Sequence, residues 1–322
     1  MDYTGALTRS VAAFVATYLD GRTDVCVGLS GGPDSVALTA AAVQAGLSVR
    51  ALVVDHALQP GSADVAAAAA NCAKDLGADA EVLTVTVGCT GGMEAAARAA
   101  RYRALEEARG GAPVLIAHTM DDQAETVLLG LARGSGARSL AGMAPWRPPW
   151  GRPLLGVRRA QTVGACAELG LRPYADPHNG DPRFTRVRVR AEVLPLLDDV
   201  LHGGVVEALA RTATGLRADN EALDSYADIA YHSAVHGNSS TSSGTELDAV
   251  AVAQLPGAVG TRVVRRWLYA AGASAPTAPV IDAVYALATG RAGGQVAVGG
   301  DIEHRLVVEC VARRLVVARI RR

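Results

Sequence analysis

The chain has 322 residues, of which 50% are hydrophobic, and its formal net charge is −1 at pH 7. This length allows a large core and two domains, as in an enzyme. The five cysteines are odd in number and include no CxxC pair, which argues against a structural zinc or iron–sulfur site and for reduced thiols in the cytosol. The apolar run Val11–Leu19 is too short to span a membrane and has no basic leader of any length, so we expect a cytoplasmic protein without a membrane partner.

The charge is distributed unevenly along the chain. Residues 1–132 carry 8 basic and 15 acidic side chains and residues 133–190 carry 11 and 3, so the net charge changes from −7 to +8. Residues 191–249 carry 2 and 10, and residues 250–322 carry 10 and 4, which gives −8 and +6. The two basic blocks are almost entirely arginine and suit contact with a nucleic-acid backbone, although arginine-rich surfaces also arise from the base composition of a genome.

The first predicted ligand site is a turn between an apolar strand and a helix. The elements in order are a helix at 7–19, a strand at 25–29, the turn Ser30–Ser35 and a helix at 34–45. Gly31 and Gly32 lack the Cβ atoms that would keep a polyanion away from the backbone, and Pro33 suits the first helical position. The exposed amides at the positive helix end, with the hydroxyl groups of Ser30 and Ser35, suit phosphate or pyrophosphate. The alternative is a plain strand-to-helix turn.

Asp34 is the unexpected residue in this turn. A carboxylate beside bound phosphate adds repulsion unless it holds a cation, so Asp34 indicates a divalent metal that arrives with a nucleotide, with Mg²⁺ as the default. A Walker-type phosphate loop is excluded, because it requires a lysine here and the single lysine of the chain is Lys74. The turn therefore predicts a nucleotide phosphate site with its metal at Asp34.

Further units follow, giving the five strand–helix units of a doubly wound, mainly parallel α/β sheet. They comprise a strand at 47–54, a helix at 63–76, a strand at 80–87, a helix at 91–107 and a strand at 113–117. Asp55 and His56 follow the first of these strands, and such sheets bind ligands at the carboxyl ends of their strands. Both residues are site candidates, with His56 either in direct contact with a ligand or supporting another group.

A second polar cluster, His118–Thr126, follows the strand at 113–117 and opens a helix. Asp122 and Glu125 are three residues apart, so both carboxylates face one way on that helix. Helix capping explains one or two acidic residues in a first turn, but not four polar groups together. The pair suits recognition of an amine, and His118 is placed to accept or donate a proton near neutral pH.

The remainder predicts a smaller, mainly helical α+β domain. Residues 192–231 have long helical periodicity and connect the domains, residues 239–244 form a flexible loop, and helices at 260–271 and 279–289 precede short strands that end near Val317. We place the two domains at residues 1–215 and 216–322. The arginines of the second domain, Arg265 and Arg266 among them, either bind RNA or solubilise a surface.

Several motifs resemble one enzyme family. The turn Ser30–Ser35 resembles the SGGxDS loop of the N-type ATP pyrophosphatases, the PP-loop superfamily, and Glu94–Tyr102 is similar to the EAxARxxRY segment of one branch of it. Residues 117–143 resemble the long motif of the tRNA(Ile)-lysidine synthetases, and Val54–Leu58 is similar to their VDHGLR. The segments Arg152–Leu155, Asp176–Asn179 and Arg186–Arg190 with Leu194 and Pro195 resemble their RPLL, DPTN and RNRIRxxxLP, with Val187 in place of an asparagine.

This resemblance implies a reaction and a set of roles. In that family ATP adenylates the C2 oxygen of the wobble cytidine in a tRNA(Ile) with a CAU anticodon, and the ε-amine of L-lysine displaces AMP to form lysidine. The implied catalytic residues are Asp34, which also holds Mg²⁺, His118 and Asp122. The implied ATP site comprises Ser30, Gly31, Gly32, Pro33, Asp34, Ser35, Asp55, His56 and Arg98. Asp122 and Glu125 would meet the lysine ammonium and Arg190 its carboxylate, and tRNA would contact Arg133, Arg138, Arg186, Arg265 and Arg266. The sequence leaves homodimer formation open.

Two other functions stay open from the residues alone. One is another enzyme of the same fold with a different acceptor. A tRNA-thiolating enzyme should show paired active-site cysteines, and the sequence has no such pair. An amidating synthetase takes ammonia from a glutaminase, and the sequence has no nucleophilic-cysteine elbow. A non-catalytic nucleotide-binding RNA chaperone is the other alternative. It would release no AMP from ATP with any tRNA.

Overall fold

A computed structural model describes residues 2–57, 61–86, 93–134, 136–176, 180–236, 246–300 and 303–321. Its contacts divide the chain into two compact units, Met1–Arg217 and Ala218–Arg322. Parts of the sequence analysis fall outside the described residues, namely Leu58, the end of the strand predicted at residues 80–87, the start of the helix predicted at residues 91–107, the Pro177–Asn179 part of one motif and the loop predicted at residues 239–244.

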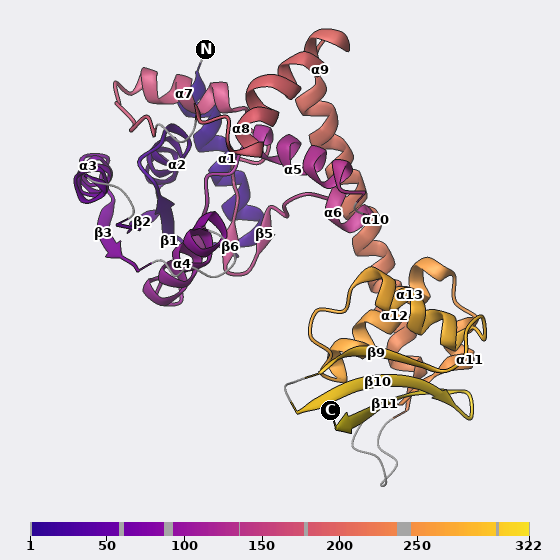
Figure 1. Ribbon diagram of the computed structural model, residues 1–322. Helices are drawn as coiled ribbons and strands as arrows, with labels where there is room; N and C mark the ends of the chain where they lie inside the picture. Colours follow the sequence, from indigo (N-terminus) through magenta and orange to yellow (C-terminus); the bar gives the residue numbers. More distant parts are fainter. Residues whose placement is uncertain are drawn as a thin grey trace. The chain divides into compact units, whose positions relative to one another are not determined.

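The first unit is built on a six-stranded sheet (Figure 1). In spatial order its strands are β3 (Asp79–Thr84), β2 (Ser48–Asp55), β1 (Asp24–Leu29), β4 (Val114–Leu115), β6 (Trp150–Gly151) and β5 (Trp146–Arg147). Neighbouring strands pair in parallel except β5 and β6, which pair antiparallel. The predicted doubly wound, mainly parallel sheet is confirmed, and the short β5–β6 pair extends it at an edge that the sequence analysis did not predict.

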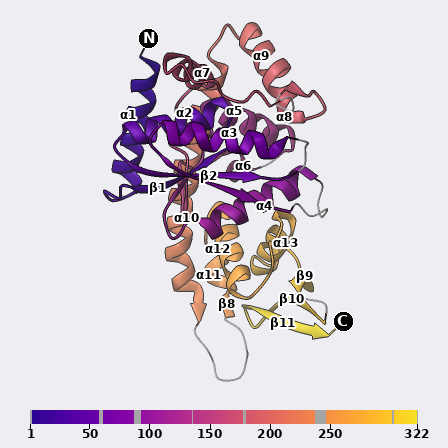
Figure 2. The same cartoon turned by 90° about the vertical axis from the view of Figure 1, so that its left-hand side faces the viewer.

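Helices cover both faces of this sheet (Figure 2). On one face lie α1 (Tyr3–Tyr18), α2 (Pro33–Gln44), α3 (Ser62–Asp75) and α7 (Arg159–Glu168), and on the other lies α4 (Met93–Ala108). Successive residues of a strand point to opposite faces. In β1, Val25 and Val27 are therefore buried in the core under α1 and α2, whereas Cys26 is buried with Leu105 of α4. Two covered faces explain why β1 carries no polar side chain after Asp24, where the strand begins.

The strand order reverses at β1. After β1 the chain adds β2 and β3 on one side and then returns to β4 on the other. In open α/β sheets such a switch point leaves a crevice outside the carboxyl ends of the two strands, where ligands bind. Helix α2 begins there after β1, and α5 (Met120–Ala132) begins there after β4. The two polar clusters, Ser30–Ser35 and His118–Thr126, therefore lie at one edge of the sheet.

Besides α7, the elements after α5 are α6 (Ala137–Leu140), α8 (Thr185–Arg188), a π-helical turn (Val189–Val193), α9 (Leu194–Val200) and α10 (Val205–Ala234). The boundary between the two units falls within the 30 residues of α10. Ala124 of α5 is buried against Val189 and Leu194, which holds the π-helical turn beside α5. The helical periodicity predicted over residues 192–231 is divided between these elements, because Gly203 and Gly204 have φ of +94° and +77° and end one helix before the next begins.

The second unit has the predicted α+β composition. Its antiparallel sheet has the order β7 (Val235–His236), β8 (Glu246–Asp248), β11 (Arg314–Arg321), β10 (His304–Val311) and β9 (Gln295–Gly300), with helices α11 (Ala249–Ala253), α12 (Gly257–Ala270) and α13 (Ala278–Ala288). Trp267, Leu268, Ile281 and Leu315 are fully buried in one core, which the end of α10 joins through Ala227. Within the described part of the chain, no helix is both long enough and apolar enough to cross a membrane.

Gly151 is the residue that lets α1 pack closely on β6 and β4. A Cβ atom at this position would lie 2.6 Å from Phe14 Cζ and 2.8 Å from Leu115 Cδ2, both in the core. We expect Gly151→Ala to lower the free energy of unfolding by about 1–3 kcal/mol, measured by urea denaturation. The matched control is Gly156→Ala, whose Cβ would meet nothing within 4 Å and which should change stability by less than about 0.5 kcal/mol. Equal stability of the two variants would contradict this packing.

Candidate active site

The turn Ser30–Ser35 joins β1 to α2 as the sequence predicts. Gly31 has φ of +82°, where a side chain would be strained, and Pro33 is the first residue of α2. The Ser35 hydroxyl accepts a hydrogen bond from the Ser30 backbone N–H at 3.2 Å and lies 3.1 Å from the Ser30 hydroxyl. The first N–H groups of a helix have no acceptor within the helix, so the start of α2 offers free donors to an anion.

Asp34 is held by two side chains of α7. One carboxylate oxygen accepts a hydrogen bond from Arg159 Nε at 3.0 Å, and the other accepts one from the Thr162 hydroxyl. Burial raises the pKa of Asp34, because desolvation of the carboxylate outweighs the attraction of Arg159. The charge argument from sequence is therefore incomplete: the carboxylate in the anion-binding turn already has a cation, and that cation is a guanidinium.

Asp122 forms the second half of the same arrangement. One of its oxygens accepts hydrogen bonds from the Thr119 backbone N–H and hydroxyl, each at 2.8 Å, which is a capping interaction at the start of α5. The other oxygen accepts from Arg159 Nη2 at 2.8 Å. Burial acts to raise the pKa of Asp122, but Arg159 and the Thr119 donors together outweigh it and lower that pKa. Asp122 thus both caps α5 and, as an ionised carboxylate, binds Arg159.

Glu125 is fully buried, and among the described residues only one of its two carboxylate oxygens has a hydrogen-bond donor. Its Oε1 accepts a hydrogen bond from Arg190 Nε at 2.7 Å. Its Oε2 has no hydrogen-bond partner among the residues that the structure describes, and the guanidinium of Arg186 lies 4.0 Å from it. Burial raises the pKa of Glu125 despite the attraction of Arg190. A buried carboxylate oxygen without a donor is costly, so this oxygen points toward a place for a cationic ligand.

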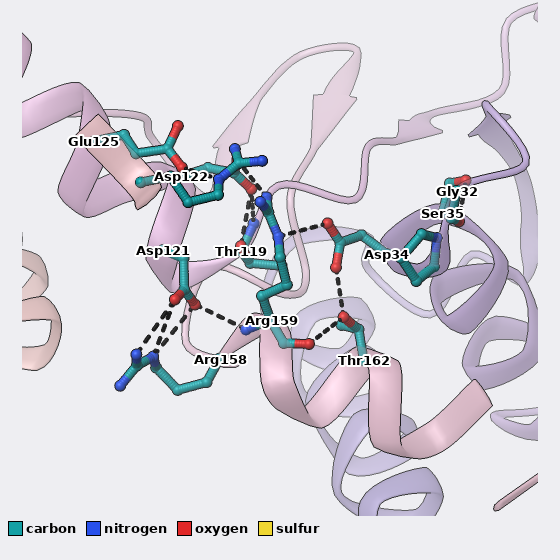
Figure 3. A network of polar contacts seen from close by, with 12 residues as sticks. Gly32, Asp34, Ser35, Thr119, Asp121, Asp122, Glu125, Arg158, Arg159 and Thr162 are labelled. Atoms are coloured by element: carbon teal, nitrogen blue, oxygen red, sulfur yellow. Dashed lines mark hydrogen bonds and ion pairs between the residues drawn. The ribbon is translucent and has the colours of Figure 1, made fainter. Parts of the chain in front are cut away.

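These contacts join into one row of alternating charges (Figure 3), which we call the ionic chain. It runs in the order Asp34, Arg159, Asp122, Arg190, Glu125, and its last two links are Arg190 to Asp122 at 3.5 Å and Arg190 to Glu125 at 2.7 Å. Arg186, 4.0 Å from Glu125 Oε2, adds a third guanidinium beside these three carboxylates. The ionic chain connects the anion-binding turn with α5 and the π-helical turn.

The two candidate histidines are not part of this row, and of the two His118 is attracted by one of its members, Asp122. Both histidines are half-buried, and Nδ1 of each is buried without a hydrogen-bond partner among the described residues. Burial lowers the pKa of His118 to about 4, against the weaker attraction of Asp122. A pKa in this range favours the neutral imidazole near pH 7, so of the two expected roles it favours proton acceptance over proton donation. Asp55 is buried, and its Oδ1 accepts a hydrogen bond from the Ala57 N–H at 2.9 Å.

Arg98 is placed apart from the ionic chain. It is exposed on α4, its guanidinium carbon lies 5.1 Å from the centre of the Tyr102 ring, and its Nη2 donates to the Tyr102 hydroxyl at 3.4 Å. Tyr102 in turn packs edge-on against Trp150, with ring centres 4.7 Å apart. Arg98 therefore lies against the Tyr102 ring.

The arginines expected to contact tRNA have different surroundings. In the first unit, Arg133 and Arg186 line a groove of about 340 Å³ together with Phe184, and Arg138 is exposed on α6. In the second unit, Arg266 pairs with Asp228 and lies 5.1 Å from the centre of the Tyr231 ring, and Arg265 of the same helix is half-buried.

Sequence reasoning missed the residues that join the site, Arg159 and Thr162. A signal for them exists at the start of α7, where Arg158 and Arg159 stand side by side. Cations are unfavourable at the positive end of a helix, so two of them there call for carboxylate partners. Arg158 pairs with Asp121 at 3.2 Å and with Glu207 at 2.5 Å. Arg159 likewise pairs with two carboxylates, those of Asp34 and Asp122.

Comparison with known proteins decides the family. The PP-loop domain family matches residues 4–197, and the TilS substrate binding domain matches residues 247–315. A tRNA(Ile)-lysidine synthase of Nocardia farcinica is 57% identical over 298 residues, 91% of each chain. The corresponding protein of Mycobacterium bovis is 56% identical over 313 residues, 96% of this chain and 95% of its own. This chain belongs to the tRNA(Ile)-lysidine synthase family. The resemblance seen in the motifs is confirmed, and the non-catalytic alternative is not supported.

The PP-loop domain match, which covers residues 4–197, includes the turn Ser30–Ser35. The PP-loop match assigns the chain to enzymes that use ATP. Among solved structures, a U34-tRNA thiolase from Methanococcus maripaludis aligns with a TM-score of 0.54 and 18% identity, covering 66% of this chain and 79% of its own. At that identity the likeness concerns the fold alone, and the lysidine synthase relatives disfavour thiolation as the function.

The lowered pKa of His118 has a consequence for stability. Between its ordinary value of 6.5 and about 4, the unfolded chain binds a proton at this residue and the folded chain does not. We therefore expect His118 to make the free energy of unfolding fall as the pH is lowered through this window. His118→Gln should show a shallower decline than the natural protein in urea denaturation between pH 7 and pH 4.5. Identical pH profiles, or an imidazole that titrates near pH 6.5 by NMR, would contradict the assignment.

Proposed function

We propose that this protein ligates L-lysine to C2 of the wobble cytidine in a tRNA(Ile) with a CAU anticodon. ATP first adenylates the C2 oxygen with release of pyrophosphate, and the ε-amine of lysine then displaces AMP. The observation that supports the proposal is the ionic chain, which links the turn Ser30–Ser35 to the buried Glu125, whose Oε2 has no hydrogen-bond partner among the described residues. Membership of the family supports the same reaction.

Lysine binding would exchange partners within the ionic chain. In the free protein Arg190 donates to Glu125 and approaches Asp122, so its guanidinium is not yet available to a carboxylate ligand. The lysine ammonium would take the place of Arg190 on the two acids, and Arg190 would turn to the lysine carboxylate. The exchange thus replaces one set of buried ion pairs by another without leaving an unpaired charge.

ATP would bind at the PP-loop with its phosphates on the amides of Ser30–Ser35. Asp34 is a hard oxygen donor suited to Mg²⁺, which supplies charge neutralisation to the phosphates when bound. Each oxygen of Asp34 accepts one hydrogen bond, from Arg159 or from Thr162, and keeps a second lone pair with which it could hold a metal. Within the described residues no group of three His, Cys, Asp or Glu is arranged to hold a metal ion. A metal here would take its remaining ligands from phosphate and water, as Mg²⁺ commonly does.

We take the remaining roles from the resemblance to the family. His118, neutral and with an unpartnered Nδ1, would accept the proton that the attacking amine loses at the cytidine. Asp55, His56 and Arg98 would complete the ATP site. The tRNA contacts would comprise Arg133, Arg138 and Arg186 in a catalytic domain at residues 1–215, and Arg265 and Arg266 in a tRNA-binding domain at residues 216–322. The match to a substrate-binding domain at residues 247–315 supports that division. The reaction would take place in the cytoplasm, where tRNA is found.

The direct test is incorporation of labelled L-lysine into unmodified tRNA(Ile). With ATP and Mg²⁺ we expect label in that tRNA, with one AMP and one pyrophosphate released for each lysine incorporated. A tRNA(Ile) whose wobble cytidine is replaced by uridine should take up no label. Release of ADP and phosphate, or AMP formation without lysine transfer, would contradict the proposed reaction.

Glu125→Gln tests the amine site within this assay. Removing one member of a buried charge pair costs about 2 kcal/mol or more, so kcat/KM for L-lysine should fall roughly 30-fold or more, while KM for ATP changes little. Glu192→Gln is the matched control, because Glu192 is half-exposed and pairs only locally with Arg188 at 2.7 Å. The control should stay within about twofold of the natural protein. An unchanged kcat/KM for lysine in Glu125→Gln would remove Glu125 from the amine site.

A further inference from the structure

We propose that Arg159 is a positioning residue that couples the ATP site to the lysine site, so that each ligand strengthens the binding of the other. The inference deepens the proposed function and rests on it for the identity of the two ligands. It concerns a residue for which neither the sequence motifs nor the relatives supply a role.

The geometry places one guanidinium between the two sites. Arg159 donates through Nε to Asp34 at 3.0 Å and through Nη2 to Asp122 at 2.8 Å (Figure 3). Its side chain is only 22% exposed, and those of Asp34 and Asp122 are 20% and 13% exposed, so little water screens these contacts. The Arg159 backbone N–H also donates to Asp121 at 2.8 Å, which anchors the residue at the start of α7. The backbone of Arg159 is therefore fixed, whereas its guanidinium can shift between the carboxylates of Asp34 and Asp122.

In the free protein, Arg159 competes with both ligands. It neutralises Asp122, which the lysine ammonium would need, and it donates to one oxygen of Asp34 in the turn that would bind the nucleotide. A bound nucleotide brings net negative charge to the PP-loop and attracts the guanidinium toward that side, away from Asp122. Asp122 then has its charge free for an ammonium. Lysine at Asp122 would in turn release Arg159 toward the nucleotide, and linkage requires the two effects to be equal.

Arg158 provides the internal comparison. It is the preceding residue, it also forms two ion pairs, and its partners Asp121 and Glu207 are not part of the ionic chain. A purely structural role for arginines at this helix start would make the two residues equivalent. Coupling requires Arg159 alone, because only its partners belong to both ligand sites.

The test is a binding cycle that does not depend on turnover. The dissociation constant of L-lysine is measured by calorimetry without nucleotide and with saturating α,β-methylene-ATP and Mg²⁺, in the natural protein and in Arg159→Met, Arg159→Lys and Arg158→Met. In the natural protein and in Arg158→Met, the nucleotide should lower that constant roughly tenfold, within the usual range of allosteric coupling. In Arg159→Met the two constants should agree within about twofold, with tighter lysine binding than normal in the absence of nucleotide. Arg159→Lys, which keeps the charge but not the fork of donors, should fall between these limits.

A structural defect and a coupling defect give different results. General loosening of the site would weaken lysine binding with and without nucleotide by the same factor and leave their ratio unchanged, and such a result overturns the proposal. Should Arg159→Met fail to fold, a coupling in Arg159→Lys equal to that of the natural protein overturns it as well, whereas a reduced coupling supports it. Absence of coupling in a natural protein that still incorporates labelled lysine overturns the coupling alone. A natural protein that binds no lysine overturns both the coupling and the proposed function.

Discussion

The bridge from Arg159 to Asp34 and Asp122 is the interaction on which the site depends. It joins a carboxylate at the start of α2 to one at the start of α5, two helices that begin at the carboxyl ends of neighbouring strands. Without a cation between them, two buried carboxylates in one crevice would repel each other, and the protonated form of at least one would be favoured. A guanidinium is suited to this place, because its planar fork serves two carboxylates at once.

Burial then gives the acids of the ionic chain different properties. The pKa of Asp122 is lowered, since Arg159 and two Thr119 donors stabilise its charge, whereas the pKa values of Asp34 and Glu125 are raised by desolvation. Glu125 has the fewest donors for its burial, and its unpartnered oxygen marks where the ionic chain is incomplete. The same desolvation keeps His118 neutral, which suits it to accept a proton and not to donate one.

The fold explains why these groups meet at all. The reversal of strand order at β1 brings the PP-loop and the start of α5 to one edge of the sheet, and α7 returns across that edge with Arg159 at its first position. The π-helical turn places Arg190 on the other side of the same acids, where Val189 and Leu194 hold it against Ala124. Four separate parts of the chain thus contribute to one ionic chain.

The sequence by itself determined the strand–turn–helix at Ser30–Ser35, the parallel sheet and the pairing of Asp122 with Glu125 on one helix face. Each of these follows from local rules, namely missing Cβ atoms, apolar strand runs and the spacing of three along a helix. Only the tertiary structure decided which cation neutralises the charge of Asp34. Arg159 lies 125 residues away along the chain and reaches Asp34 because α7 packs on α2. The pKa of His118 was equally out of reach, since it depends on how deeply the folded chain buries the ring. Charge partners and burial are long-range properties, and a linear sequence does not state them.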